Sequence, residues 1–344
     1  MRIIVALLAS LVWLKGNLHT HTAMSDGDST PQEMAAWYRD RGYQFLVITD
    51  HDKITTIAPP EGLVLLPGEE VTDKLPGKPL HVNAIGLTRV VPPQGGKTPV
   101  EVLQRNIDAV REAGGIPLVN HPNFGWALGA EELLQLRGVT LLEIASGHPY
   151  VNADGPPSAE AMWDEMLSAG MRVWGVAVDD SHHLKNPWDK YVALPGKGWV
   201  VVRAEKADAK SILGALESGE FYASTGVELE EVAPASVKVK EKNGARYRIQ
   251  FIGAKGRVLQ ETVGPSASYS IRGDEGYVRA KVTDSNGLRA WTQPVFLKAS
   301  EDLSTPSETF LHRSITIDVT FTGASSASTM TPATGTGSMN PSRS

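Results

Sequence analysis

His19 and His21 are the residues of this sequence with the clearest capacity for chemistry, because they lie two positions apart in a short apolar stretch. Side chains two apart on a strand point to the same side, so both imidazoles could bind one cation from one face. Histidine pairs at this spacing also serve as hydrogen-bonded core residues. The pair alone leaves both interpretations open.

Further candidate ligands follow short apolar runs that we expect to be strands. The carboxyl ends of strands are where α/β barrels build their active sites, and core histidines would have no reason to gather there. The pattern therefore favours a metal site made of imidazoles and carboxylates. The candidates are His51 after 45–49, Glu69 and Glu70 after 63–66, His121 after 116–120, and Asp180 with His182 after 173–178.

The elements that would position these residues extend from about residue 13 to 228. Apolar runs alternate there with amphipathic helical stretches, which is typical of an α/β fold with parallel strands. Helix starts at Thr30 and Thr98 each carry a proline and a glutamate in the first turn. Two more helices are expected at 158–169 and 208–218. The expected strands are 16–21, 45–49, 63–66, 81–86, 116–120, 140–145, 173–178 and 199–203.

The flanking segments differ in texture from this first module. Residues 229–299 alternate apolar and polar side chains, with Asn243-Gly244 and Asn286-Gly287 as turns, and predict a small antiparallel β-sandwich of immunoglobulin-like type. The Ser, Thr, Ala and Gly rich segment 300–344 is predicted to be disordered. Residues 1–12 suit either a short export signal or a buried first strand, so exported and cytoplasmic locations both stay open. The run is too short to span a membrane.

Composition narrows the chemistry. None of the 344 residues is cysteine, which excludes disulfides, thiolate nucleophiles and Cys-type zinc sites. A net charge of −6 argues against a broad basic surface for nucleic acid. A small phosphorylated substrate, including a nucleotide or a nucleic-acid end, remains compatible. Nothing in the composition indicates an oligomeric state.

The combined order of the motifs resembles the PHP family, the polymerase and histidinol phosphatase domain family, over residues 16 to about 225. Each motif alone is weak, whereas their order is specific. The motifs are His19-Thr20-His21, Ser25-Asp26-Gly27, Thr49-Asp50-His51, Pro67-Gly68-Glu69-Glu70, His81, Asn120-His121-Pro122 and Asp180-Ser181-His182.

This resemblance implies a distorted (β/α)7 TIM-like barrel that holds two or three divalent metal ions. Histidine and carboxylate ligands suit Mn²⁺, Fe²⁺ or Zn²⁺. Glu69 competes with Glu70 as a ligand and Asp179 with Asp180, and the Gly-x-Glu and Asp-Ser-His spacings favour Glu70 and Asp180. The implied groups are His19, His21, Glu70 and Asp180; then Asp26, His51 and His182; then Glu70 again with His81 and His121.

Such a centre predicts hydrolysis. Neighbouring metal ions about 3.5–4 Å apart can share a hydroxide and hold phosphoryl oxygens during in-line attack. We therefore expect a metal-dependent phosphoesterase acting on a nucleotide, an oligonucleotide end, or a sugar or alcohol phosphate. Glu70, Asp180 and His182 would act through the metals, and His148 or His183 could protonate a leaving alkoxide, with a structural role as the alternative. Asp50 and Asp52 are expected to orient His51.

Two other functions stay open at the sequence level. A shared hydroxide attacks carbonyl carbon as readily as phosphorus, so an amidohydrolase-type metallohydrolase is the first alternative. A non-catalytic PHP module with a binding β-sandwich is the second. Loss of ligands would indicate that second case, and no expected ligand is missing from the sequence.

Overall fold

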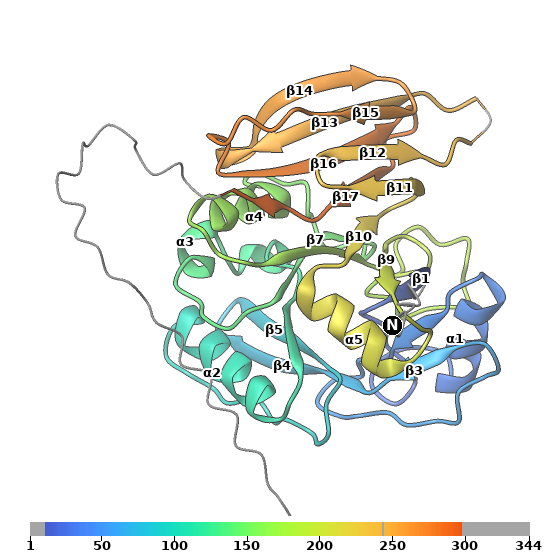
Figure 1. Cartoon of the computed structure of the whole chain (residues 1–344). Helices are drawn as coiled ribbons and strands as arrows, with labels where there is room; N and C mark the ends of the chain where they lie inside the picture. Colours follow the sequence, from blue (N-terminus) through green and yellow to red (C-terminus); the bar gives the residue numbers. More distant parts are fainter. Residues whose placement is uncertain (1–10, 243, 298–344) are drawn as a thin grey trace, which may run out of the picture. The chain divides into compact units, whose positions relative to one another are not determined.

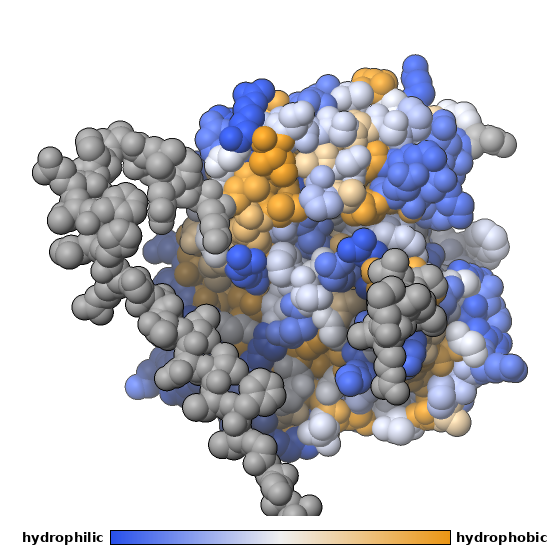
Figure 2. All heavy atoms as spheres, in the orientation of Figure 1, coloured by the Kyte–Doolittle hydropathy of each residue, from blue (hydrophilic) through white to orange (hydrophobic). Residues whose placement is uncertain are grey.

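The computed structural model describes residues 11–242 and 244–297, which form a mixed α/β fold (Figure 1). The predicted tail at 300–344 and most of the predicted signal or strand at 1–12 lie outside the described residues. On the face drawn in Figure 2, apolar areas alternate with hydrophilic ones. Within the described segments, every helix is too short or too polar to cross a bilayer.

Five strands form one sheet in the order β4-β5-β6-β7-β8. β6, β7 and β8 are parallel, whereas β4, β5 and β6 are antiparallel to one another in turn. β6 and β8 are buried along their whole length, as strands of a covered parallel sheet should be. The strands are β4 (Gly68–Leu75), β5 (Lys78–Ile85), β6 (Ile116–Val119), β7 (Leu141–Ser146) and β8 (Trp174–Val178).

A second, ten-stranded sheet has the order β14-β13-β16-β17-β10-β9-β1-β2-β3, with β18 paired to β16. β1, β2 and β3 are parallel, and β9 and β10 are antiparallel to their neighbours. Hydrogen bonds between β10 and β17 continue this sheet into the C-terminal strands. The first members are β1 (Val12–Asn17), β2 (Phe45–Val47), β3 (Val64–Leu66), β9 (Trp199–Ala204) and β10 (Phe221–Ser224).

The described residues do not form the closed (β/α)7 barrel that the family resemblance implies. The first ten strands, β1 to β10, divide between these two sheets because β4 returns directly into β5 as an antiparallel hairpin, without a helical crossover. Two isolated parallel bridges link the sheets instead, Thr20 to Ser181 and His51 to Glu70. Both bridges lie where candidate ligands lie.

The four helices expected from the sequence are present. Thr30 forms a complete capping box with Glu33, whereas Thr98 caps only the backbone N–H of Glu101, whose carboxylate accepts from the backbone N–H of Lys97 instead. α2 packs on β5 and β6, α4 on β7, and α5 on β9. The helices are α1 (Pro31–Asp40), α2 (Pro99–Glu112), the short α3 (Ala130–Leu133), α4 (Ala159–Ser168) and α5 (Ala209–Ser218), with 3-10 turns η1 (Phe124–Trp126) and η2 (Ala254–Gly256).

The C-terminal strands are antiparallel, as their alternating pattern predicts. Three of them form a separate sheet in the order β11-β12-β15, and Val237 of that sheet shares a buried cluster with Ile249 and Val282 of the large sheet. Gly287, with a φ of +84°, makes the tight turn from β16 to β17. The strands are β11 (Leu229–Ala233), β12 (Ser236–Val239), β13 (Tyr247–Gly253), β14 (Arg257–Val263), β15 (Ser266–Ser268), β16 (Tyr277–Asp284), β17 (Arg289–Thr292) and β18 (Val295–Phe296).

Candidate metal centre

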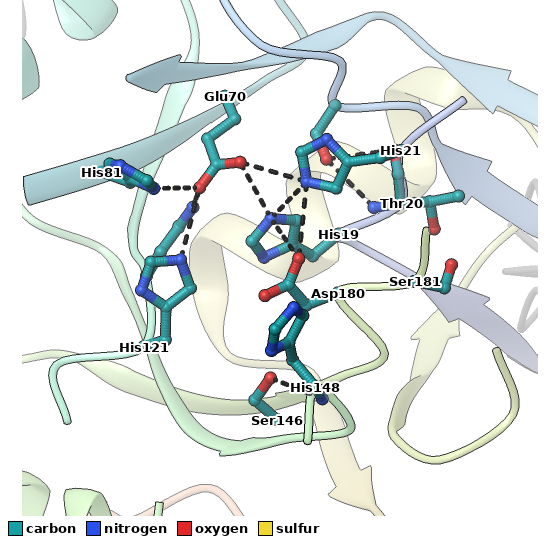
Figure 3. Close-up of polar contacts among 12 residues, drawn as sticks. His19, Thr20, His21, Glu70, His81, His121, Ser146, His148, Asp180 and Ser181 are labelled. Atoms are coloured by element: carbon teal, nitrogen blue, oxygen red, sulfur yellow. Dashed lines mark hydrogen bonds and ion pairs between the residues drawn. The ribbon is translucent and has the colours of Figure 1, made fainter. Parts of the chain in front are cut away.

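All nine candidate metal ligands lie together in the structure, and most of them are seen in Figure 3. They come from the residues that follow β1, β2, β6 and β8 and from the adjacent strands β4 and β5. The bridge between Thr20 and Ser181 holds the segment after β1 beside the segment after β8, and the bridge between His51 and Glu70 holds β2 beside β4. The two sheets therefore meet at the site.

The first group contains His19, His21, Glu70 and Asp180, all of them buried. The Nε2 atoms of His19 and His21 lie 3.1 Å apart, and each is 3.1–3.3 Å from Oε2 of Glu70. Each is also 3.3–3.4 Å from Oδ1 of Asp180. Ligands bound about 2.0–2.1 Å from one cation lie about 2.9–3.4 Å from one another. The spacing of these atoms suits a shared cation.

Glu70 reaches a second group with its other carboxylate oxygen. Oε1 lies 2.8 Å from Nδ1 of His81 and 3.4 Å from Nε2 of His121. The side-chain amide of Asn120 donates a hydrogen bond of 2.7 Å to the same oxygen. The two oxygens of the Glu70 carboxylate thus face two sets of imidazoles.

Asp26 organises the third group. Its Oδ2 lies 3.3 Å from Nε2 of His51, and its Oδ1 lies 3.4 Å from Nε2 of His182. Oδ1 is also 3.5 Å from Nδ1 of His21, so this group adjoins the first one. Asp26 is the most exposed of these side chains, with 52% of its surface accessible. This group therefore faces the solvent side of the site.

Hydrogen bonds fix the tautomers of three candidate ligands. Nδ1 of His19 faces a carboxylate oxygen of Glu143 at 2.6 Å, and Nδ1 of His182 faces the carbonyl of Asp180 at 3.0 Å, so both nitrogens must donate. Nδ1 of His51 lies 2.6 Å from the hydroxyl of Thr72, which already donates to a backbone carbonyl. In the neutral rings, the Nε2 lone pairs then face carboxylates.

A lone pair that faces a carboxylate at 3.3–3.4 Å is stable only with positive charge between the two atoms. Burial disfavours protonation of His21, but its hydrogen bonds with Asp180 and Glu70 raise its pKa to about 9. Burial likewise opposes ionisation of Glu70, yet the neighbouring His19 and His81 hold the pKa of its carboxyl well below the usual range. The donor set is therefore suited to divalent cations.

The structure distinguishes the paired acidic candidates. Glu69 and Glu70 are consecutive on β4, so their side chains point to opposite faces. Glu69 turns away and accepts a hydrogen bond from the backbone N–H of Val91 at 2.6 Å. Asp179 also turns away and accepts from Gly198 N at 2.8 Å and from the Tyr38 hydroxyl at 2.7 Å. Only Glu70 and Asp180 of these four face the imidazoles.

A cavity of about 140 Å³ opens onto the ligands. His148, Phe124 and Val151 line it together with seven of the nine candidates. Burial lowers the pKa of His148 to about 4, and the N–H of Tyr150 donates to its Nδ1, so the ring is neutral and carries its proton on Nε2. His183 does not line this cavity, and its Nδ1 lies 3.4 Å from Asp28.

Glu143 is the main residue of the site that was not predicted from the sequence. It is buried on β7, with one oxygen facing His19 and the other accepting from the backbone N–H of His121 at 2.8 Å. A glutamate inside the apolar run 140–145 was the available signal. Asp50 was predicted to orient His51, but among the described residues its carboxylate binds Thr22, Ser25 and Thr55 rather than the His51 ring. It accepts from the N–H of Thr22 and the hydroxyl of Ser25, and so holds the loop that carries Asp26.

No family model and no curated protein matches the sequence. Among solved structures, the chain is similar to a two-domain protein from Bacteroides vulgatus described as containing a predicted PHP-like metal-dependent phosphoesterase, with 16% identity and a TM-score of 0.48 over 83% of this chain and 96% of that one.

Two further structures are similar over about half of the chain. One is an amidohydrolase from Chromobacterium violaceum with bound sulfate and no metal, with 17% identity and a TM-score of 0.38 over 52% of this chain and 92% of that one. The other, from Bifidobacterium adolescentis, is described as a candidate metal-dependent phosphoesterase, with 18% identity and a TM-score of 0.35 over 48% and 87%.

Proposed function

We propose that this protein is a metal-dependent phosphoesterase that hydrolyses a small phosphate ester. The observation that carries the proposal is the carboxylate of Glu70, whose two oxygens face two separate sets of imidazoles at the floor of one cavity. A buried carboxylate shared in this way suits two neighbouring divalent cations. The nine candidate ligands would hold two or three such cations.

Bound divalent cations would supply a water activated for attack on phosphorus and positive charge for the phosphoryl oxygens. The chain itself orients the ligands, since Glu143 and Thr72 accept from Nδ1 of His19 and His51 and leave each Nε2 free to bind. Histidine and carboxylate ligands of this kind suit Mn²⁺, Fe²⁺ or Zn²⁺. No protein nucleophile is needed.

His148 is placed to assist the leaving group. Its neutral ring lines the cavity and holds its proton on Nε2, because Nδ1 accepts from the N–H of Tyr150 at 3.2 Å. An Nε2–H at this position can donate a hydrogen bond to the oxygen of a departing alkoxide. His148→Ala should therefore lower kcat more than His148→Gln, which keeps a donor.

The first experiment is hydrolysis by protein that has been stripped with chelator and then reloaded with Mn²⁺. Phosphate release is measured from p-nitrophenyl phosphate, nucleoside monophosphates and sugar phosphates. Glu70→Gln should abolish the release, whereas the neighbouring Glu69→Gln should retain it because Glu69 faces away from the site. Failure of the wild-type protein to hydrolyse any phosphate ester would contradict the proposal.

A second candidate function is favoured by one observation. Among the described residues that line the cavity, none is lysine or arginine, so a phosphate would be held by the metals and imidazoles alone. An amidohydrolase-type reaction at a carbonyl carbon needs no such cationic side chain. Competitive inhibition by inorganic phosphate supports the phosphoesterase, and amide turnover without a phosphate effect supports the amidohydrolase.

A further inference from the structure

A row of aromatic rings leads from the candidate metal centre toward solvent. The ring centroids of His121 and Phe124 lie 5.3 Å apart, and those of Phe124 and His148 lie 6.1 Å apart. Tyr150 continues the row at 5.5 Å from His148 and leaves 67% of its surface exposed. Phe124, His148 and Tyr150 are called the aromatic wall below.

Hydrogen bonds join the two backbone segments that carry the aromatic wall. The side-chain amide of Asn123, next to Phe124, donates to the carbonyl oxygens of Asn152 at 2.8 Å and Pro157 at 3.2 Å. The segment that carries Tyr150 is therefore fixed to the segment that carries Phe124. A surface that is already ordered loses little conformational entropy when it binds a ligand.

The cavity and the wall differ in size and chemistry. The cavity of about 140 Å³ has a floor of imidazoles and carboxylates, which suits a phosphoryl group. Phe124 and His148 line one side of the cavity, and Tyr150 lies beside His148 outside it. The part of an ester that leaves the cavity on this side passes Phe124 and His148 and reaches Tyr150. The Tyr150 ring is two-thirds exposed, so its face is open to a group that could cover it. Aromatic faces favour offset stacking with other planar rings.

We propose that the aromatic wall binds a planar aromatic ring in the leaving group of the substrate, and so makes this protein selective for aromatic over aliphatic phosphate esters. A nucleobase or an aryl group has the required chemistry. This inference rests on the proposed phosphoesterase function. Stacking of one ring predicts roughly a threefold to tenfold preference, expressed mainly in KM.

The test compares two esters of matched size, 2-phenylethyl phosphate and 2-cyclohexylethyl phosphate. Their alcohols have similar acidity, so a difference in kcat/KM reports binding of the ring rather than leaving-group chemistry. The wild-type protein should favour the phenyl ester by the factor given above. Tyr150→Ala should remove most of this preference by raising KM for the phenyl ester alone.

Tyr191→Ala is the matched control, because Tyr191 is similarly exposed, at 63%, and makes no ring contact with the wall. It should keep the preference. Equal kcat/KM for the two esters in the wild-type protein would overturn the inference. So would an equal loss of preference in Tyr150→Ala and Tyr191→Ala.

Binding provides a readout that is independent of turnover. The Mn²⁺-loaded protein is titrated calorimetrically with 3-phenylpropylphosphonate and with 3-cyclohexylpropylphosphonate, neither of which can be hydrolysed. Tighter binding of the phenyl compound that is lost in Tyr150→Ala supports ring binding by the aromatic wall, whether or not any ester is hydrolysed. Absence of hydrolysis would contradict only the proposed function. Equal binding of the two phosphonates would contradict ring binding by the aromatic wall. If the esters were still hydrolysed, the proposed phosphoesterase function would stand.

Discussion

Glu143 contacts two separate parts of the candidate site at the scale of single residues. One oxygen lies 2.6 Å from Nδ1 of His19 and the other accepts from the backbone N–H of His121. A carboxylate that accepts from Nδ1 fixes the tautomer of a histidine ligand and increases the basicity of the coordinating nitrogen. Glu143 is therefore a positioning residue for two candidate ligands.

Replacing Glu143 should weaken metal binding without removing a ligand. Glu143→Gln keeps the size of the side chain but places an amide donor against one of the two N–H groups. We expect Mn²⁺ affinity to fall by about 10–100-fold, as measured by calorimetric titration. Glu165→Gln, on the exposed side of α4, is the control and should bind Mn²⁺ normally. Unchanged affinity in Glu143→Gln would contradict this role.

Metal binding should also release protons. The pKa of His21 is raised to about 9, so below that pH the metal-free imidazole carries a proton that a cation must displace. The apparent affinity for Mn²⁺ should therefore rise with pH from about 6.5 to about 9 and then level off. Titrations in two buffers of different ionisation enthalpy count the protons released. Affinity that is constant over this range would contradict the prediction.

At the scale of elements, β4 is where the structure departs most from the sequence prediction. Glu69 and Glu70 were expected to follow the strand at 63–66, but they lie within a new strand that pairs with β5. Charged residues in Gly68–Leu75 conceal the strand, because a pattern with few apolar residues does not predict one. Pairing with β5 settles which glutamate faces the site.

The contact between α4 and β16 is the clearest ionic link between elements. The guanidinium of Arg279 on β16 is fully buried and binds Asp164 at 2.7 Å and Glu160 at 2.8 Å, both on α4. The Cζ atom of Arg279 also lies 4.8 Å from the centroid of the Trp163 ring. Charges buried in this way depend on their partners, since an unpaired buried carboxylate is costly.

Removing this guanidinium should destabilise the fold. We expect Arg279→Met to lower the free energy of unfolding by about 3–5 kcal/mol, because Asp164 would lose its cationic partner. Urea denaturation followed by circular dichroism measures the change. Arg248→Met, at an exposed position on neighbouring β13, should change stability by less than about 0.5 kcal/mol. Similar midpoints for the two variants would contradict the assignment.

At the scale of the whole molecule, the candidate ligands come from both sheets. His19, His21 and His51 follow strands of the ten-stranded sheet, whereas Glu70, His81 and Asp180 belong to or follow strands of the five-stranded sheet. Two isolated bridges pair the sheets beside the site, and a shared buried cluster packs the sheets together elsewhere in the described residues. Cations bound at the site would therefore connect the two sheets.

Removal of metal should consequently lower the thermal stability of the molecule. At a free Mn²⁺ concentration about 100 times Kd, binding to the native state adds about 2.7 kcal/mol, which predicts a Tm roughly 5 °C or more above that of the chelated protein. Scanning calorimetry with Mn²⁺ and with EDTA measures this difference. Glu70→Gln should show a much smaller one. If EDTA left the Tm of the wild-type protein unchanged, a metal link between the sheets would be contradicted.

The parts that could be predicted from sequence were local ones. Thr30 and Pro31 mark the start of α1, and His51 and His121 follow apolar runs that do form β2 and β6. The missed parts depend on distant pairing. The hydrogen bond between His19 and Glu143 joins residues 124 positions apart, and no spacing rule reaches that far. The division of the strands between the sheets follows from the β4–β5 hairpin, whose first strand has too few apolar residues to be predicted.

The most direct test of the metal centre is the number of Mn²⁺ ions bound per chain. Stripped protein is reloaded, equilibrated with buffer that contains no chelator, and analysed by inductively coupled plasma mass spectrometry. The shared carboxylate of Glu70 predicts two or three ions in the wild-type protein and a loss of at least one in Glu70→Gln, with Glu69→Gln unchanged. Fewer than two ions in the wild-type protein would contradict the account.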